Sequence, residues 1–340
     1  MRYRYRSPVY KLRTGTESAF LIMFHTCEEI FLSLAVVYMK MATVTQVKYG
    51  AMIDENITTA GKSKINLQAI LEKQDYALLK HYQHAKAYEP STVMFGTLAM
   101  LGHFGRNSQY CHYLSDDVFP INLYCVLVGP SGSGKTSIIK RIKQASRKCE
   151  RTFTDFYLKE MEFDGKIKTV TSIISNVNNL SLRKHLATGN KLLVNDEIDV
   201  FFDPQGVYDS TTNKTVGDVG LLLQAFDGIT DDDRTTGSTS VYIEQAHLSI
   251  LGGTTGTHYS TLLSCFEKYR GFEGIHNRML YLVLEPFDPI RPQHLRKGKR
   301  SKNMPTLAHY AIIAHLFGDV QYEWQMSDEE KQRKQRGSYC

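Results

Sequence analysis

One short glycine-rich segment of the sequence has the residue types that bind phosphate groups. Residues 129–136 read Gly-Pro-Ser-Gly-Ser-Gly-Lys-Thr and satisfy the pattern G-x-x-x-x-G-K-[ST]. In this pattern, backbone N–H groups surround phosphate oxygens, the lysine contacts the β- and γ-phosphates, and the final hydroxyl is a ligand of Mg²⁺. The expected phosphate-binding residues are Gly129, Pro130, Ser131, Gly132, Ser133, Gly134, Lys135 and Thr136.

The residues on either side of this loop match the structural context that the motif requires. Residues 123–128 are an apolar run typical of a buried strand, and residues 137–143 are typical of the start of a helix. A helix N-terminus favours anions, because its first N–H groups have no partner within the helix. The sequence therefore predicts a nucleoside triphosphate site, with ATP and Mg²⁺ as the expected ligands.

A pair of adjacent carboxylates follows a second apolar run. Residues 192–194 are expected to form a strand, and Asp196 and Glu197 come directly after it. We expect Asp196 to hold Mg²⁺ through water and Glu197 to act as a general base that activates water, which favours ATP hydrolysis. A strand end followed by a helix cap remains the alternative interpretation. For Asp199 the sequence gives no clear role, and a solvated position is the simplest expectation.

Two later segments contain candidates for contacts with the γ-phosphate. A third apolar strand, at residues 247–251, ends in a glycine- and threonine-rich tip, where Thr254 is the candidate phosphate sensor and Thr255 the second choice. The alternative is a turn whose threonines face water. Arg278 precedes a further strand, the place where ring ATPases have an arginine that contacts a neighbouring subunit's nucleotide. Pairing with a structural carboxylate is the equally weighted alternative.

Together these segments resemble the domain-of-unknown-function P-loop ATPases of phages, plasmids and other mobile elements, which are often attached to primase modules and are similar to replicative helicases. The resemblance covers roughly residues 93–330 and is carried by residues 123–136, 192–197, 226–228, 248–254 and 274–284. It implies an oligomeric ATPase linked to nucleic acid, with DNA favoured. It also supports the roles given above to five residues, which are Lys135, Thr136, Asp196, Glu197 and Arg278. The sequence departs from the family in lacking a primase or zinc module and the glutamine-proline often found after the strand of Thr254.

Composition is ordinary for a globular protein. The 340 residues are 42% hydrophobic and 22% charged, and a net charge of +6 is too mild to demonstrate nucleic-acid binding. The six cysteines have no paired C-x-x-C spacing, which argues against a disulfide framework and a zinc ribbon. We therefore expect an intracellular protein of the cytoplasm or nucleus, not a secreted one. His81 with His84, and His103 with the Cys111–His112 pair, have the spacing of metal ligands, but metal binding is the less favoured interpretation.

The sequence divides into four parts around an α/β core. Residues 1–62 are an atypical leader whose apolar stretch, 19–39, is interrupted by Glu28 and Glu29, so a packed helix is favoured over a membrane anchor. Met41 is an alternative start that would leave this leader outside the working domain. Residues 63–120 are expected to form a helical lead-in with a second helix near residues 91–104. Residues 121–290 are the P-loop ATPase core, and residues 291–340 are a basic linker followed by a C-terminal helical portion.

Within the core, the expected strands are joined by helical crossovers, which implies a mainly parallel sheet. The predicted strands are 122–128, 168–174, 191–195, 246–251 and 279–284. For the long polar insert at residues 201–240, a solvated surface loop is favoured over a loop that faces a central channel. Residues 291–302 contain six cations and no acid, which suits a contact with phosphate backbones, a nuclear address or a flexible linker. Helices are expected at residues 306–317 and from Ser327 onward.

The favoured function is an oligomeric, helicase-like, ATP-hydrolysing motor or switch that acts on nucleic acid. Two alternatives remain. A small-molecule or nucleotide kinase shares the phosphate loop, but it usually has an arginine-rich lid, which residues 201–240 do not show. A nucleotide-gated scaffold binds ATP without useful turnover, and it has no need of the second acid, Glu197.

Overall fold

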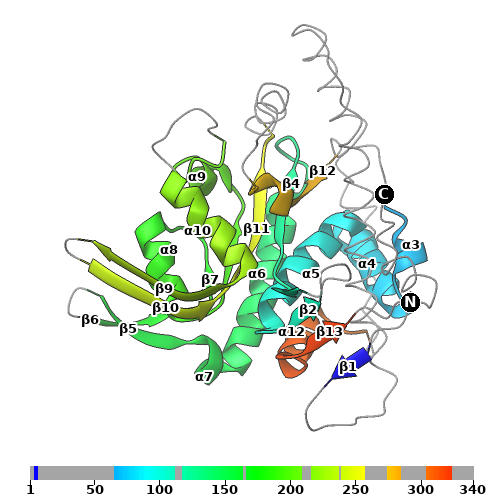
Figure 1. The fold of residues 1–340 in the computed structure, drawn as a ribbon. Coiled ribbons are helices and arrows are strands. Elements are labelled where there is room, and N and C mark those ends of the chain that lie inside the picture. Colours follow the sequence, from blue (N-terminus) through cyan, green and yellow to red (C-terminus); the bar gives the residue numbers. More distant parts are fainter. Residues whose placement is uncertain are drawn as a thin grey trace, which may run out of the picture.

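The computed structural model describes residues 4–6, 65–111, 117–163, 166–208, 216–236, 239–256, 274–284 and 304–323 (Figure 1). Several expectations fall outside these residues and stay predictions. They concern the leader from residue 7 to residue 62, the basic run 291–302 and the helix from Ser327.

A five-stranded parallel sheet forms the centre of the molecule, in the order β12-β4-β11-β8-β7. Its strands are β4 (Tyr124–Val128), β7 (Ile173–Ile174), β8 (Lys191–Asn195), β11 (Leu248–Thr254) and β12 (Met279–Val283). Helices lie between successive strands from β4 to β11 and cover the sheet, which confirms the predicted α/β fold of a P-loop NTPase. Because β11 lies between β4 and β8, the phosphate loop and the acid pair are separated by a single strand.

Alternation of side chains along β4 divides the core into two layers. Cys125 and Leu127 pack on the side of α5 (Pro90–Phe104), α6 (Lys135–Thr152) and α12 (Leu307–Leu316). Tyr124, Val126 and Val128 pack on the other side, against α8 (Asn179–Leu186), α9 (Asp199–Phe202) and α10 (Val216–Asp227). Figure 1 shows these helices on opposite sides of the sheet. The sheet is therefore buried on both faces, as its continuous apolar strands predict.

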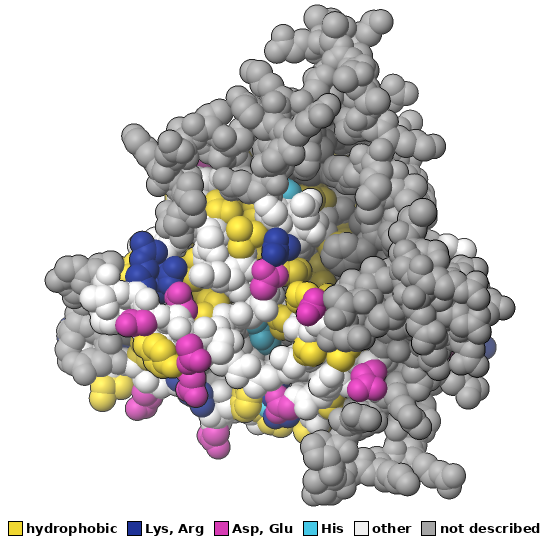
Figure 2. All heavy atoms as spheres, in the orientation of Figure 1, with side chains coloured by type: hydrophobic (Ala, Val, Ile, Leu, Met, Phe, Trp, Pro, Cys, Tyr) yellow, Lys and Arg dark blue, Asp and Glu magenta, His cyan; other side chains and the backbone are white. Residues whose placement is uncertain are grey.

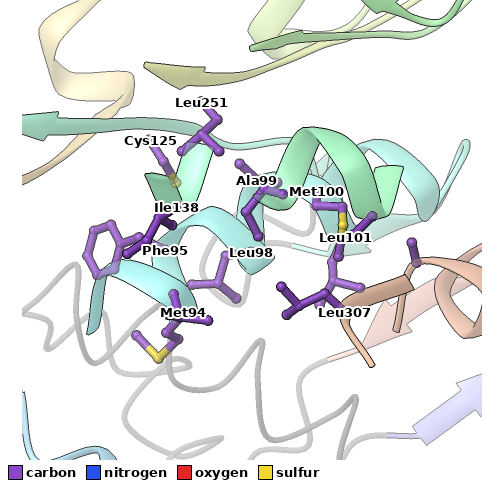
Figure 3. Packing of buried hydrophobic residues seen from close by; sticks show 14 of the residues in the cluster. Met94, Phe95, Leu98, Ala99, Met100, Leu101, Cys125, Ile138, Leu251 and Leu307 are labelled. Carbon is purple, nitrogen blue, oxygen red and sulfur yellow. The ribbon is translucent and has the colours of Figure 1, made fainter. Parts of the chain in front are cut away.

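Helix α5 is buried along its whole length. Figure 3 shows its apolar side chains between the sheet, at Cys125 and Leu251, and the helices that carry Ile138 and Leu307. Pro90 occupies the first turn, where its missing N–H costs nothing, and the Glu89 side chain accepts a hydrogen bond from the Thr92 N–H at 2.8 Å. The sequence placed this helix correctly because Pro90 marks its start.

The predicted lead-in is only partly helical. It begins with α3 (Leu67–Ile70) and α4 (Lys73–Lys86), but after α5 come the strands β2 (Gln109–Cys111) and β3 (Val118–Pro120). These strands join β1 (Arg4–Arg6) and β13 (Gln321–Glu323) in a second sheet, ordered β1-β13-β2-β3. The prediction of a helical lead-in for residues 63–120 is therefore wrong only for β2 and β3, because their sheet depends on pairing between segments far apart in the sequence.

Helix α12 confirms the prediction for residues 306–317. Its N-cap is Thr306, whose hydroxyl accepts a hydrogen bond from the His309 N–H at 3.2 Å. The helix packs on α5 and α6, so it forms part of the layer that supports the phosphate loop.

The strand predicted at residues 168–174 is two separate strands. The first part belongs to β6 (Lys166–Val170), which pairs with β5 (Lys159–Phe163) in an antiparallel hairpin that follows the short helix α7 (Thr154–Tyr157). Only β7 joins the central sheet. β-Branched residues on both sides of Ser172, at positions 169–171 and 173–174, made the segment look like one strand. The chain leaves one sheet for the other at Thr171 and Ser172.

The insert predicted as a solvated loop contains regular structure. Its described part holds α9, α10 and a long hairpin of β9 (Ile229–Thr236) and β10 (Thr239–Ala246). Val241 and Ile243 are buried on one face of the hairpin, while Tyr242 and Glu244 are exposed on the other. Within the predicted insert, which ends at Ser240, the loop prediction is therefore wrong for α10 and β9. The strands of the hairpin are polar except for one row of buried side chains, so their sequence resembles a loop.

A buried carboxylate connects the C-terminal end of α6 to the segment just before β7. Glu150 accepts hydrogen bonds from the Ser172 N–H at 2.7 Å and from Arg147 at 3.0 Å. Lys191, at the start of β8, is 1% exposed, and its burial lowers its pKa to about 8, although the carboxylate of Glu150 acts in the opposite direction. The hydrogen bond between Glu150 and Ser172 fixes α6 relative to the start of β7, which pairs with β8 in the sheet.

Candidate nucleotide site

The glycine-rich loop has the backbone conformation that phosphate binding requires. It leaves β4 at Val128 and enters α6 at Lys135. Gly132 and Gly134 have φ angles of +86° and +83°, in the left-handed region that favours glycine. Gly129 does not share this conformation; its lack of a side chain matters because a Cβ there would lie 3.1 Å from the Cβ of Leu284.

The Lys135 ammonium is folded into its own loop. Its Nζ donates hydrogen bonds to the carbonyl oxygens of Gly129 and Pro130 and, at 3.0 Å, to the hydroxyl of Ser133. The residue is buried, and this burial lowers its pKa. Phosphate oxygens are stronger acceptors for an ammonium than these neutral oxygens, so the geometry suits a lysine that changes partners when a nucleotide binds.

The Asp196–Glu197 turn lies at the same edge of the sheet. Both carboxylates are exposed immediately after β8, and the Ile198 N–H donates to the Gly253 oxygen of β11 at 2.8 Å. Asn195 holds the turn, because its side-chain oxygen accepts a hydrogen bond from the Glu197 N–H at 2.9 Å. The alternative interpretation, a helix cap, is wrong here, because the next helix, α9, has Ile198 as its N-cap without a side-chain hydrogen bond. Both carboxylates remain exposed.

The donor set at this edge fits a magnesium ion bound together with a nucleotide. Thr136 is exposed in the first turn of α6, and Asp196 follows the strand two positions away in the sheet. A hydroxyl and a carboxylate are oxygen ligands of the kind Mg²⁺ prefers, with phosphate and water completing its shell. Among the described residues, no three His, Cys, Asp or Glu side chains form a cluster that would hold a metal by themselves.

Thr254 ends β11 between the phosphate loop and the acid turn. Its backbone oxygen accepts a hydrogen bond from the Gly129 N–H at 3.2 Å. Its hydroxyl donates to a carboxylate oxygen of Asp199 at 2.7 Å and accepts from the Gly256 N–H at 3.0 Å. Thr255, the next residue, is exposed.

Asp199 is the residue of this region that the sequence did not assign. The expectation of a solvated carboxylate is wrong, because Asp199 is partly buried and accepts hydrogen bonds from both Thr254 and Tyr208. Its position at the first turn of a helix, just after two other acids, was the only signal in the sequence. The partners lie nine and 55 residues further along the chain, so no local pattern indicates them.

Arg278 lies at the opposite end of the sheet from the phosphate loop. It ends the 3-10 turn η1 (His276–Arg278), and the next residue, Met279, pairs with Tyr124 at the start of β4. With a rise of about 3.3 Å per residue, more than 13 Å of strand separates it from the loop. Its side chain donates to both carboxylate oxygens of Asp227, at 3.1 and 2.6 Å. Within one chain, Arg278 therefore pairs with a structural carboxylate, which was one of the two interpretations.

The fold is that of a P-loop NTPase domain. Residues 125–268 match the family model described as "ATPase family associated with various cellular activities (AAA)". The matched part contains the phosphate loop, the acid pair and Thr254, and it ends before Arg278. This match supports an ATP-binding and ATP-hydrolysing P-loop protein. A search of the curated proteins found no match to the sequence. Among the described helices, none is long and apolar enough to cross a membrane.

Proposed function

We propose that this protein hydrolyses ATP at the edge of the sheet where β4, β11 and β8 end. The supporting observation is that the phosphate loop and the Asp196–Glu197 turn emerge from strands separated only by β11. In this proposal, residues 129–136 bind the phosphates, with Lys135 on the β- and γ-phosphates. Thr136 and Asp196 would hold Mg²⁺, which neutralises charge on the phosphate oxygens when bound.

Glu197 has the position of the general base. It is exposed beside the acid that would hold the metal, and its backbone is fixed by Asn195. In hydrolysis, a water oxygen forms a bond to the γ-phosphorus, the bond to ADP breaks, and a proton leaves the water. A carboxylate placed at this point accepts that proton, which is the role we assign to Glu197.

We further propose that the ATPase acts on nucleic acid, with DNA favoured, inside the cell. Support comes from the resemblance to helicase-like proteins of mobile elements and from the basic residues 291–302. On the face in Figure 2, acidic side chains stand beside the basic ones, so the described residues of this face offer no broad basic surface. The exposed face of the β9–β10 hairpin is acidic as well, with Asp231, Asp233 and Glu244. The basic run is therefore the proposed contact.

ATP hydrolysis by the wild type is expected to rise when single-stranded DNA is added at low salt. The binding constant for DNA should fall as salt increases, by roughly 0.7 to 0.9 log units per log unit of salt concentration for each DNA phosphate that the protein neutralises. A variant with four basic residues changed to Gln, at Arg296, Lys297, Lys299 and Arg300, should show a flatter salt dependence. The effect should be the same for every DNA sequence tested. The matched control changes four basic residues elsewhere, which are Lys140, Lys148, Arg151 and Lys166, all exposed in the structure.

Parallel assays with RNA, duplex DNA and no nucleic acid separate the outcomes. Binding and hydrolysis that respond to none of them would contradict the nucleic-acid role and leave the kinase or scaffold alternatives. A kinase would instead show turnover that depends on a small hydroxyl-bearing acceptor. The chain between Phe201 and Ser240 has Lys214 and Arg234 as its only lysine and arginine, too few for the lid that a kinase usually closes over its substrate.

The proposed ATPase works as an oligomer, with Arg278 acting on a neighbour's nucleotide. Arg278 cannot reach its own phosphate loop, so a catalytic role requires a second subunit. Mixing Arg278→Ala with Lys135→Ala subunits, each inactive alone, should restore part of the hydrolysis, because each pair then contains one complete shared site. A mixture of Lys135→Ala with Glu197→Gln is the control and should stay inactive, since both residues belong to one subunit's site.

The competing interpretation is that Arg278 only stabilises the fold through Asp227. It predicts no recovery in the mixture, a monomeric mass in the presence of ATP, and equal losses of melting temperature for Arg278→Ala and Asp227→Ala. That combination would remove Arg278 from the catalytic site.

A further inference from the structure

Asp199 joins three separate segments beside the candidate site. It begins α9, two residues after Glu197, and one of its carboxylate oxygens accepts a hydrogen bond from Tyr208 at 2.5 Å. The other oxygen accepts the Thr254 hydroxyl of β11 at 2.7 Å. The proposed scheme of hydrolysis gives Asp199 no task, yet its contacts connect the acid turn to the strand that separates it from the phosphate loop.

The direction of the Thr254 side chain follows from alternation along β11. A Cβ at Gly252 would lie 2.7 Å from the Cβ of Ile198, on the α9 side of the sheet. A Cβ at Gly253 would lie 3.0 Å from Ile139 of α6, the helix that begins at the phosphate loop. Thr254 shares the side of Gly252, so its hydroxyl points toward α9 and its proton is directed at Asp199.

We propose that Asp199 is a positioning residue of the ATPase, which holds the Asp196–Glu197 turn in register with the end of β11 through the Thr254 hydroxyl. The proposal rests on the proposed ATPase function. It also changes the role of Thr254, which acts in this arrangement through Asp199 and not as a direct donor to phosphate. The backbone oxygen of Thr254 also accepts a hydrogen bond from the Gly129 N–H. The same residue therefore connects the acid turn to the first residue of the phosphate loop.

Tyr208 keeps the second oxygen of Asp199 occupied. Burial and the hydrogen bond to Asp199 raise the pKa of Tyr208, so its phenol remains a donor at neutral pH. Its ring packs edge-on against Phe202, with centroids 6.0 Å apart. The carboxylate is thus fixed from two directions, one at each oxygen. An amide at position 199 places an NH₂ donor where one of these oxygens now accepts, so one of the two hydrogen bonds is lost.

The test compares Asp199→Asn, Thr254→Val and Thr254→Ser with the wild type. Loss of a hydrogen bond to a charged group corresponds to about a ten- to hundredfold fall in kcat. We expect this fall in Asp199→Asn and Thr254→Val, with an unchanged affinity for a non-hydrolysable ATP analogue, and substantial rescue in Thr254→Ser. The Asp199→Asn/Thr254→Val double variant should be no slower than the slower single variant, because both act through one bond.

Matched control variants make the same substitutions, Asp to Asn and Thr to Val, at positions remote from the candidate site. In the β9–β10 hairpin, Tyr242 donates to Asp231 at 2.6 Å, a tyrosine–aspartate pair remote from the site. Asp231→Asn is the control for Asp199→Asn, and Thr235→Val, on an exposed strand position, is the control for Thr254→Val. These controls should hydrolyse ATP at the wild-type rate.

Melting temperatures separate positioning from a loss of structure. Wild-type kcat in Asp199→Asn and Thr254→Val would overturn the proposal, as would additive losses in the double variant. The proposal would also be overturned if kcat fell in proportion to the melting temperature of each variant and Thr254→Ser did not restore it. A wild type without ATPase activity refutes the proposed function itself, whereas an active wild type with an equally active Asp199→Asn variant refutes only the positioning role.

Discussion

Glu197→Gln is expected to bind Mg²⁺ and ATP as the wild type does and to hydrolyse ATP about 10²- to 10⁴-fold more slowly. The amide has nearly the shape of the carboxylate, and the side chain is exposed, so the backbone of the turn keeps its hydrogen bond to Asn195. An amide does not accept a proton from water at neutral pH, which removes the general base and leaves the phosphate contacts intact.

Nucleotide affinity and steady-state phosphate release, measured on the same preparation, test this expectation. Glu244→Gln makes the same chemical change at an exposed position of the β9–β10 hairpin and should leave both quantities unchanged. Hydrolysis at the wild-type rate by Glu197→Gln would end the assignment of the base. A loss of affinity that depends on Mg²⁺ would instead assign Glu197 to the metal.

The parts of the site that the sequence predicted are those with local signals. Strand β4, the glycine turn and the start of α6 occupy one continuous segment, so spacing alone gives their order. The acid pair follows an apolar run that is covered on both faces of the sheet, and such runs are visible without tertiary information. Pro90 and Thr306 mark the starts of α5 and α12 for the same reason.

The parts that escaped prediction depend on contacts between distant segments. The small sheet joins β2 to β13, across 210 residues between Cys111 and Gln321. The β9–β10 hairpin has so few buried positions that its sequence resembles a loop. Asp199 could not be assigned because a carboxylate near a site gives no sign of which hydroxyl groups it will meet. For Arg278, the sequence correctly predicted a position just before a strand, but it could not identify Asp227 as the partner of its side chain.

Lys135→Ala is expected to weaken ATP binding by at least about ten- to hundredfold, the value of one hydrogen bond from a charged donor, and to abolish measurable hydrolysis. The ammonium is the only cation that the described loop, residues 129–136, directs at its own centre. Its neighbours in the loop supply N–H groups, which are weaker partners for phosphate than a full charge. Without the lysine, the loop loses both charge and the donor that distinguishes the β- and γ-phosphates.

Thermal unfolding with and without nucleotide separates this effect from a loss of fold. A ligand at 100 times its Kd stabilises the folded state by about 2.7 kcal/mol, so Mg²⁺ and ATP should raise the melting temperature of the wild type. Without nucleotide, Lys135→Ala should melt near the wild-type temperature, because burial of the charged ammonium already costs the folded wild type free energy. Addition of ATP should raise the melting temperature of this variant only slightly. Lys140→Ala, at an exposed position of the same helix, is the matched control and should respond as the wild type does. An equal ATP-induced rise in Lys135→Ala would show that the loop does not hold the nucleotide through this lysine.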